Sequence, residues 1–409
     1  MDIKRKKRRG LQAWVSWLIE KILAASGGIT AFIILLIVVF LFKEGVGLFQ
    51  SPRVDEGYVL LMHSSNEVDQ LSADELKGIF DEDITNWTEV GGKNQAITSL
   101  RLDQIMDRFT EEELGGEYEY LSQRIGELIA TTPGVIAFVP TLYAPLDHPA
   151  VQAMTDNTIA LRDFFVGKEW IPTATPVPLF GTLPLLMGTL WVSLFAILIA
   201  LPLGLGVAIY LAELASPRVR SLLKPVIELL AGIPSVVYGF FGLVVLVPWV
   251  QRVLDLPVGE TAFVGSLILA IMALPTLISV AEESMKKTPR ALREASLALG
   301  ATHWQTIYKV VVPYASSGIS AGVVLGIGRA LGETMAVLMV TGNAALIPHT
   351  LMQPVRTIPA TIAAELGEAA AGGSHYQALF LLGAILFLMT LIVNLMAEAL
   401  AKKQHNKGF

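Results

Sequence analysis

Long uncharged apolar runs alternate with polar segments along the chain, and they predict six membrane-spanning helices. A helix needs about 20 apolar residues to cross a bilayer. Five uncharged runs reach this length, and a sixth is interrupted only by Arg329 and Glu333. The six runs are 22–42, 179–211, 229–250, 261–281, about 316–342, and 376–397. One such run also fits the core of a soluble protein, but six in one chain exclude that class.

The distribution of lysine and arginine predicts the orientation, because these residues favour short cytoplasmic segments. A basic cluster at 4–9 precedes the first run, whereas the short segments after the third and fifth runs hold only Arg252 and Arg356. We therefore expect both termini in the cytoplasm and the segment between the first two runs outside. A basic head and an apolar run are shared with cleaved signal peptides, but the length of this run favours an uncleaved anchor.

Composition agrees with lipid as the solvent, since 53% of the residues are hydrophobic and only 16% are charged. Soluble domains carry about a quarter charged residues. The net charge of −6 is the sum of two unlike parts. Residues 43–180 hold 23 acidic and 9 basic residues, and the rest of the chain holds 13 acidic and 21 basic residues. There is no cysteine, and the six histidines lack metal-ligand spacing. No Gly-Lys-Ser/Thr phosphate loop is present, so we expect no ATP hydrolysis by this chain, no catalytic residue and no cofactor.

The longest cytoplasmic segment, 282–315, carries a spaced pattern of Glu294, Ala295, Gly300 and Pro313. It resembles the EAA loop of ABC importer permeases, with Ser, Val and Val at three positions where that family has Ala, Ile and Leu. We expect a short helix, a glycine turn, a second helix and re-entry into the membrane at Pro313. Glu294 is placed to meet basic groups of an ATPase. The alternative is an amphipathic loop lying on lipid headgroups.

Further stretches resemble the PstC-type permease family of phosphate ABC transporters. They are Gly-Lys-Glu-Trp-Ile-Pro from 167, Phe-Gly-Thr-Leu-Pro from 180, Ala-Gly-Ile-Pro-Ser-Val-Val-Tyr-Gly from 231 and Gly-Arg-Ala-Leu-Gly-Glu-Thr-Met-Ala from 328. The resemblance covers about 165 to the C-terminus and the first run. It implies an all-α polytopic permease of the ABC importer type I fold in the bacterial cytoplasmic (inner) membrane, with inorganic phosphate as cargo.

The same resemblance implies partners. They are a second permease subunit of the PstA type, a dimer of ATP-hydrolysing subunits and an extracytoplasmic phosphate-binding protein. The lipid bilayer surrounds the spans, and we expect no nucleic acid. Two rival readings stay open: another oxyanion such as sulfate or molybdate as cargo, and a membrane-anchored ligand sensor that lacks an ATPase.

Small and helix-breaking residues gather at the start of the third run. Gly232, Pro234, Ser235 and Gly239 are expected to allow close helix approach or gating, as small residues do between membrane helices. The same close approach is expected at Gly204 and Gly206. A proline inside a span indicates a bend that lines a cavity rather than lipid. Plain packing is the equally weighted alternative for each of these residues.

Two charges interrupt the fifth run. Arg329 lies near its middle, and Glu333 follows four residues later, so an uninterrupted helix would present both on one face. Charged side chains at this depth usually face a bundle interior or a water-filled route. The alternative is a structural ion pair. With the family resemblance, we expect Arg329 to attract phosphate, Glu333 to temper its field and favour a proton-bearing anion, and Thr334 to offer a hydroxyl.

The acidic segment 50–165 predicts an α/β domain outside the membrane. Its signals are a Ser72–Glu75 capping box, a helical pattern at 121–130, and a turn followed by a strand at 132–139. These stretches resemble pieces of the phosphate-binding protein, but Leu-Asp-Gln follows Arg101 where that family has Ser-Gly-Thr. We therefore expect docking of a separate binding protein, or a structural cap, and leave that choice open.

The predicted organisation divides the chain into consecutive parts. They are a basic N-terminus (1–21), the first transmembrane helix (22–42), the outer insertion (50–165), the permease core with helices 2–6 (179–401), the coupling loop within it (282–315) and a cytoplasmic tail (402–409).

Overall fold

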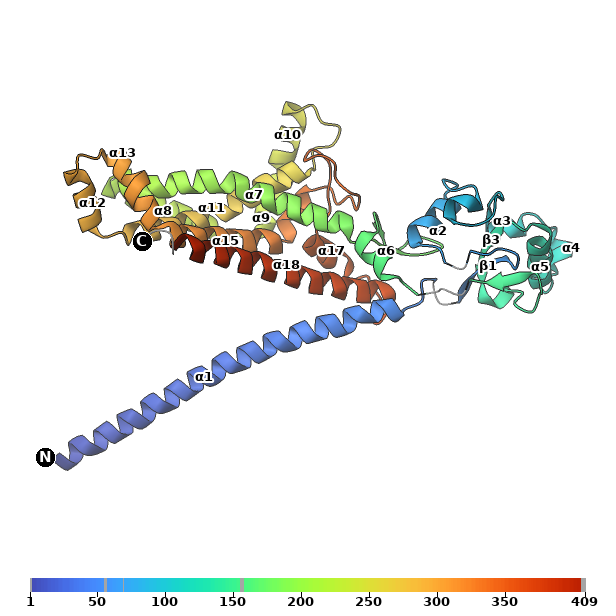
Figure 1. Cartoon of the computed structure of the whole chain (residues 1–409), viewed down its shortest axis with the longest axis horizontal. Helices are drawn as coiled ribbons and strands as arrows, with labels where there is room; N and C mark the ends of the chain where they lie inside the picture. The colour runs from blue at the N-terminus through green and yellow to red at the C-terminus, as the bar shows by residue number, and fades with distance from the viewer. Residues whose placement is uncertain (1, 55–56, 69, 155–157, 406–409) are drawn as a thin grey trace.

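The computed structural model describes residues 2–54, 57–68, 70–154 and 158–405. Figure 1 shows a bundle of long helices, a smaller domain with a sheet at one end of it, and helix α1, which diverges from the bundle. The helices α12 and α13 lie at the end of the bundle opposite that domain. The predicted all-α membrane fold with an α/β insertion is confirmed. Residues 406–409 of the predicted tail lie outside the described residues.

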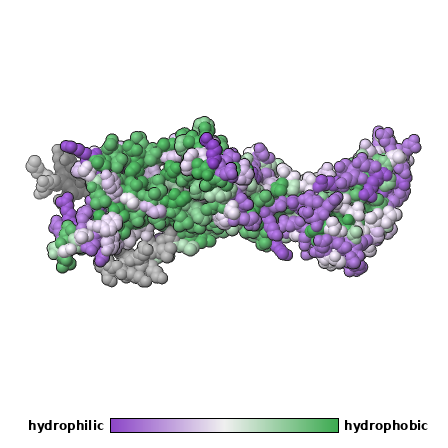
Figure 2. All heavy atoms as spheres, turned by 90° about the horizontal axis from the view of Figure 1, so that it is seen from above, coloured by the Kyte–Doolittle hydropathy of each residue, from purple (hydrophilic) through white to green (hydrophobic). Residues whose placement is uncertain are grey.

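Two apolar helices, α7 (Leu183–Ile209) and α11 (Ala262–Lys286), pack along each other at the centre of the bundle. Helix α15 (Ser316–Gly332) packs against both, and α18 (Ser374–His405) packs against α15. On the face that Figure 2 shows, apolar side chains cover most of the bundle, whereas polar ones cover most of the small domain. A helix satisfies its own backbone hydrogen bonds, which makes this arrangement stable in lipid.

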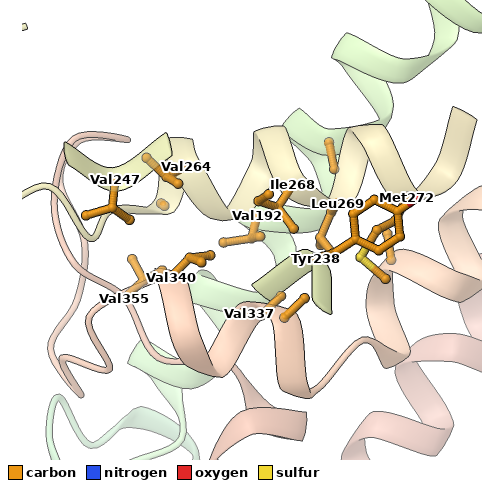
Figure 3. Packing of buried hydrophobic residues seen from close by; sticks show 14 of the residues in the cluster. Val192, Tyr238, Val247, Val264, Ile268, Leu269, Met272, Val337, Val340 and Val355 are labelled. Atoms are coloured by element: carbon orange, nitrogen blue, oxygen red, sulfur yellow. The ribbon is translucent and has the colours of Figure 1, made fainter. Parts of the chain in front are cut away.

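The bundle core lies where α7 and α11 meet two short helices, α9 (Ser235–Phe241) and α16 (Met335–Val340). Figure 3 shows Val192 of α7 and Ile268 of α11 close to Val337 and Val340 of α16. Ala330 of α15 belongs to the same cluster, so residues before and after the interruption between α15 and α16 pack together against the central pair of helices.

Helix α1 (Asp2–Val46) touches the bundle only near its C-terminal end, where it packs on α18. The rings of Phe40 and Phe380 meet edge to face with centroids 5.4 Å apart. A Cβ placed on Gly45 would lie 2.8 Å from the backbone of Leu381, so glycine allows the close approach. The first span is longer than predicted and continues into the 3-10 turn η1 (Gly47–Gln50).

Five helical segments are long and apolar enough to cross a membrane, and a sixth span results if one bent pair is counted, within the described ranges. That pair joins His303–Tyr314 to Ser316–Gly332 at 67°. The prediction of a continuous fifth span over 316–342 is wrong, because α15 ends at Gly332 and α16 begins only at Met335.

The predicted start of the third span at Leu229 is also wrong. Helix α8 (Pro217–Ala231) ends before Pro234, and the apolar segment runs from Ser235 through α9, the π-helical turn η5 (Gly242–Leu246) and α10 (Val247–Val253). The residue before a proline disfavours helical geometry, which explains the separation. The second span likewise begins at Leu183 rather than Leu179, since Leu179–Phe180 forms strand β6, paired with β5 (Trp170–Ile171).

Several short helices connect the long ones. They are the π-helical turn η4 (Tyr210–Leu214) after α7, then α12 (Arg290–Ala298), α13 (His303–Thr306), the π-helical turn η6 (Ile307–Val311) and α14 (Val312–Tyr314) between α11 and α15, and α17 (Ile358–Glu365) before α18.

The insertion contains a four-stranded sheet in the order β2-β3-β1-β4. Strand β1 (Tyr58–His63) runs antiparallel to β3 (Val135–Pro140) and β4 (Val151–Ala153), while β2 (Thr98–Arg101) runs parallel to β3. Successive residues of β1 and β3 face two separate apolar clusters, as the two-residue period of a strand requires.

Helices cover this sheet and connect its strands. They are α2 (Ala73–Phe80), α3 (Leu102–Met106), α4 (Glu111–Leu114), α5 (Leu121–Thr131) and α6 (Leu161–Val166), with 3-10 turns η2 (Trp87–Val90) and η3 (Thr141–Tyr143). The predicted capping box is confirmed: Ser72 Oγ accepts from the Glu75 amide at 3.2 Å, and Glu75 Oε2 accepts from the Ser72 amide at 2.7 Å. The helix and strand predicted at 121–139 are also confirmed.

A neck joins the insertion to the bundle, formed by Leu48 before the insertion and by Trp170 and Phe180 after it. These residues share an apolar cluster with Leu185 of α7 and Leu382 of α18. Val177 and Leu179 pack into the core of the insertion itself. The folded unit of the insertion therefore extends past residue 165.

Candidate functional site

The break between α15 and α16 interrupts a membrane-spanning segment at two polar residues. Glu333 is extended, with φ −71° and ψ 131°, and Thr334 has φ −114° and ψ −63°. Glu333 Oε1 accepts hydrogen bonds from the amides of Thr334 at 3.1 Å and Ala336 at 3.4 Å. The carboxylate therefore satisfies amides at the start of α16 that have no helical acceptor.

Arg329 lies in the last turn of α15 and is half-buried. Its side chain makes no hydrogen bond or ion pair within the part of the chain that the structure describes. Its charge reaches Tyr238 of α9 electrostatically, and the Tyr238 hydroxyl donates to Leu230 O at 2.8 Å. A cation near the C-terminal end of a helix is favoured by the helix dipole.

The expectation that Arg329 and Glu333 extend from one helix face is wrong. Helix α15 stops at Gly332, so the four-residue spacing no longer places the two side chains together. Glu333 turns instead toward the backbone of α16. The structure therefore does not contain the ion pair between Arg329 and Glu333 that the sequence left open as the alternative.

Thr334 and Gly332 line an open hollow of about 510 Å³. The other lining residues belong to or follow α17, with Leu386 of α18 added: Pro359, Ile362, Ala363, Leu366 and Gly367. Arg329 is not among them. Thr334 Oγ1 donates to Gly332 O at 3.3 Å, so its hydroxyl is partly engaged within the break.

The predicted packing residues bring α9 against this break. A Cβ on Gly239 would lie 2.9 Å from Ala336 Cα, so glycine permits direct contact between α9 and α16. Pro234 precedes the first residue of α9, Ser235. Gly232 lies in the turn between α8 and α9, and a Cβ placed on it would lie 3.4 Å from Leu229 O, an ordinary contact, so no close helix approach occurs there within the described chain.

The two glycines predicted to pack in α7 differ. A Cβ on Gly204 would lie 2.2 Å from Leu277 Cδ2 of α11, in agreement with close helix packing. No described atom lies within 4 Å of the corresponding position on Gly206, so the expectation of close approach is wrong there within this chain. Helical position rather than residue type decides which glycine faces the neighbour.

The segment predicted to couple to an ATPase presents an exposed helix. No residue of α12 is buried, and Glu294 and Ala295 are exposed. Gly300 has φ +82° and ends the helix, with its amide donating to Leu297 O at 2.9 Å. Leu299 is 90% exposed. Pro313 lies in α14, directly before the 67° bend into α15.

Sequence reasoning missed a cluster around Glu365, the last residue of α17. Arg356 Nη1 lies 2.6 Å from Glu365 Oε1, and His375 Nε2 and Trp170 Nε1 each lie 2.9 Å from Oε2. Burial raises the pKa of Glu365, but the hydrogen bonds from His375 and Trp170 and the charge of Arg356 outweigh it and lower that pKa. Arg356 and His375 lie 9 and 10 residues from Glu365, too far for neighbours on one helix, and Trp170 lies 195 residues away, so no local sequence pattern indicates these contacts.

It also missed the pair formed by Arg293 and Glu213, which lie 2.7 Å apart. Arg293 directly precedes the Glu294 motif, so its position could have been noted, but its partner lies 80 residues earlier. Among the described residues no group of three or more His, Asp or Glu side chains is arranged to hold a metal ion.

Comparisons with known proteins agree with this architecture. Residues 200–406 match the family model described as "Binding-protein-dependent transport system inner membrane component". The chain is 36% identical over 281 residues to the probable ABC transporter permease protein YqgH of Bacillus subtilis strain 168, covering 68% of this chain and 91% of that protein.

It is also 40% identical over 249 residues to the phosphate transport system permease protein PstC of Mesorhizobium japonicum, covering 56% of this chain and 75% of that protein. A solved inward-facing structure of the MetNI methionine ABC transporter aligns with a TM-score of 0.42 at 17% identity, over 55% of this chain and 94% of that one. The family match and the extent of the YqgH alignment establish membership: the chain belongs to the binding-protein-dependent transport system inner membrane components.

Proposed function

We propose that this chain is a permease subunit of an ATP-driven importer and that it carries inorganic phosphate across the inner membrane. The relative from Mesorhizobium japonicum is named for phosphate transport. The observation that carries the proposal is Arg329, a half-buried cation within the fifth span that has no partner in the described chain. An arginine at mid-membrane costs about 2.5–3.5 kcal/mol on insertion scales. Its planar fork suits the oxygens of a phosphate anion.

Glu333 has a different part in this proposal from the one expected for a neighbour on the same helix. Its Oε1 caps α16, so the carboxylate does not neutralise Arg329 directly. Its second oxygen, Oε2, has no hydrogen-bond donor among the described residues and offers an acceptor for the proton of hydrogen phosphate. Sulfate carries no proton near neutral pH. Thr334 adds a hydroxyl in the lining of the adjoining hollow.

The broken span offers a means of alternating access. Helix α16 packs against α9 through Gly239, and both follow a break in the chain. Unwound backbone at membrane depth is tolerated where it lines a cavity. In the proposed cycle, α9 and α16 shift relative to α11 and change which side of the membrane reaches Arg329.

The exposed face of α12 supports attachment of a dimer of ATP-hydrolysing subunits. Glu294 and Ala295 are exposed on it, and Leu299 follows at the Gly300 turn. Exposed apolar residues beside a charged one fit a protein groove better than water. Movement of that dimer would reach the bundle through α12 to α14 and the bend at Pro313.

The remaining partners and the orientation complete the proposal. The insertion and α12 lie at opposite ends of the bundle, which supports an extracytoplasmic insertion and a cytoplasmic coupling loop, with both termini inside (Figure 1). One chain with up to six spans does not enclose a path alone. A second permease subunit of the PstA type and an extracytoplasmic phosphate-binding protein therefore belong to the complex.

The insertion is proposed to dock the binding protein or to cap the permease rather than to bind phosphate. The Arg101 amide donates to Gln104 Oε1 at 2.9 Å, and the Arg101 guanidinium donates to Thr175 O at 3.2 Å. The groups that would meet an anion at this strand end are therefore used within the chain. The acidic charge of 43–180 also opposes an anion at long range.

The test is uptake of radiolabelled phosphate by cells that carry the complete transporter with Arg329→Gln, with Arg218→Gln as the control. Arg218 is exposed on α8, and its guanidinium has no partner in the described ranges. Arg329→Gln should reduce uptake while ATPase subunits still co-purify, and Arg218→Gln should transport normally. Unchanged uptake in Arg329→Gln would exclude the assigned role.

Competition assays with the unaltered protein separate the rival functions. Excess unlabelled phosphate should suppress uptake, whereas sulfate and molybdate should not. Equal competition by either anion would instead assign another oxyanion as cargo. Failure of any ATPase to co-purify would favour a membrane-anchored sensor.

A further inference from the structure

One buried carboxylate lies at the end of α7 nearest the coupling loop. The π-helical turn η4 follows α7 directly, and the side chain of Glu213 within this turn is only 5% exposed. A buried carboxylate needs a partner to stay ionised. Arg293 of α12 supplies it, with Nη2 2.7 Å from Glu213 Oε1.

The same nitrogen of Arg293 makes a second contact. Nη2 also donates to Met285 O at 2.9 Å, in the last turn of α11. One guanidinium therefore joins α12 to both central helices of the bundle. Within the described chain, Arg293 is the only side chain of α12 that forms a hydrogen bond with α7, η4 or α11.

The other end of this connection is held firmly. Arg220 of α8 donates from Nε to Leu211 O at 2.7 Å and from Nη2 to Ala212 O at 3.0 Å, which fixes the backbone around η4. Glu282 of α11 is also buried, and it pairs with Lys224 of α8 at 3.4 Å and with Lys286. Because η4, α8 and α11 are tied together, a displacement applied at Arg293 would move them as a unit.

Two adjacent residues of α12 have different surroundings. Glu294 is exposed, and its side chain has no partner in the described part of the chain. Arg293, one position earlier, is turned inward and is 26% exposed. The helix therefore presents Glu294 outward to a partner while Arg293 connects it to the spans.

We propose that the Arg293–Glu213 ion pair is the strut through which movement of α12 reaches α7 and α11. Arg293 is a positioning residue in this role: it touches neither cargo nor nucleotide. The inference rests on the proposed function, in that an ATPase must act on α12. It adds the specific side-chain connection between that surface and the bundle.

The test is a double-mutant cycle in the reconstituted full transporter, measuring phosphate transported per ATP hydrolysed. The variants are Arg293→Gln, Glu213→Gln and the pair together, with Arg218→Gln as control. Each single variant should retain the ATPase subunits and ATP hydrolysis but lose about tenfold in coupling. The double variant should be no worse than either single one, since both remove the same connection.

Three results would overturn the strut: normal coupling in both single variants, losses that multiply in the double variant, or loss of ATPase binding in Arg293→Gln alone. If the glutamine variants do not assemble, Arg293→Lys keeps a charge opposite Glu213 and should couple better than any variant lacking it. Coupling in Arg293→Lys equal to that of the unaltered protein would contradict the need for the guanidinium contact with Met285 O. Failure of the unaltered complex to hydrolyse ATP in response to phosphate-loaded binding protein would instead reject the proposed function.

Discussion

The indole nitrogen of Trp170 donates a 2.9 Å hydrogen bond to Glu365, which lies 195 residues later in the chain. Trp170 belongs to the neck below the insertion, and Glu365 ends α17. This contact ties the neck to the bundle at the end where α18 begins.

Replacing Trp170 with Phe should destabilise the protein by about 1–3 kcal/mol, because a hydrogen bond to a charged group is lost in a buried setting. Thermal unfolding of the purified chain in detergent measures the change. The matched control is Trp191→Phe, since the Trp191 indole packs on Phe195 and donates no hydrogen bond in the described structure. Equal shifts in the two variants would assign the effect to ring size rather than to the hydrogen bond.

The lowered pKa of Glu365 predicts a pH dependence of stability. A carboxyl group whose pKa is lower in the folded state contributes stability above its ordinary value of 4.5, and that stability is lost as the pH falls through the folded value. The unfolding temperature should therefore drop more steeply below pH 4.5 in the unaltered protein than in Glu365→Gln. Parallel curves for the two proteins between pH 7 and the acid limit would contradict this assignment.

Gly239→Ala should weaken the contact between α9 and α16. Its Cβ would lie 2.9 Å from Ala336 Cα, and backbone cannot move aside as a flexible side chain does. Overpacking of this kind costs about 1–3 kcal/mol. The control is Gly206→Ala in α7, where the new Cβ meets open space in this chain and should add about 0.5–1 kcal/mol of stability. Unfolding midpoints of the assembled complex would show whether the two variants move in opposite directions.

Gly300→Ala should disturb the turn after α12, because φ at this position is +82°. A left-handed conformation costs about 1–2 kcal/mol for a residue with a Cβ. Asn tolerates this conformation better than Ala, so the destabilisation in Gly300→Asn should be smaller than that in Gly300→Ala. The amount of ATPase that co-purifies should decrease in the order Gly, Asn, Ala. An Asn variant weaker than the Ala variant would point to side-chain contacts instead of backbone strain.

The sequence was sufficient where a feature depends on local chemistry. The capping box of Ser72 and Glu75 and the membrane helices follow from residues within one or a few turns of each other. The same applies to the α/β character of the insertion, because short periodic patterns specify its elements.

The break at Glu333 shows where such reasoning fails. An apolar run with two charges predicts a single helix. The residues of the run do not indicate that the Glu333 carboxylate accepts a hydrogen bond from the amide of Ala336 or that α15 ends before it. The expectation that Glu333 and Arg329 share one helix face failed for the same reason. Contacts such as Arg293 with Glu213 are decided by tertiary packing, across 80 residues of intervening chain.

The neck has a consequence for how the insertion is carried. Leu48 and Phe180 belong to one apolar cluster with α7 and α18, so the chain leaves the bundle and returns to it at a single place. Deleting the sheet domain and bridging its two stems with a short linker would leave α1 and α7 in register. The sheet domain is in that sense a separable module that is attached to the helical bundle at one place.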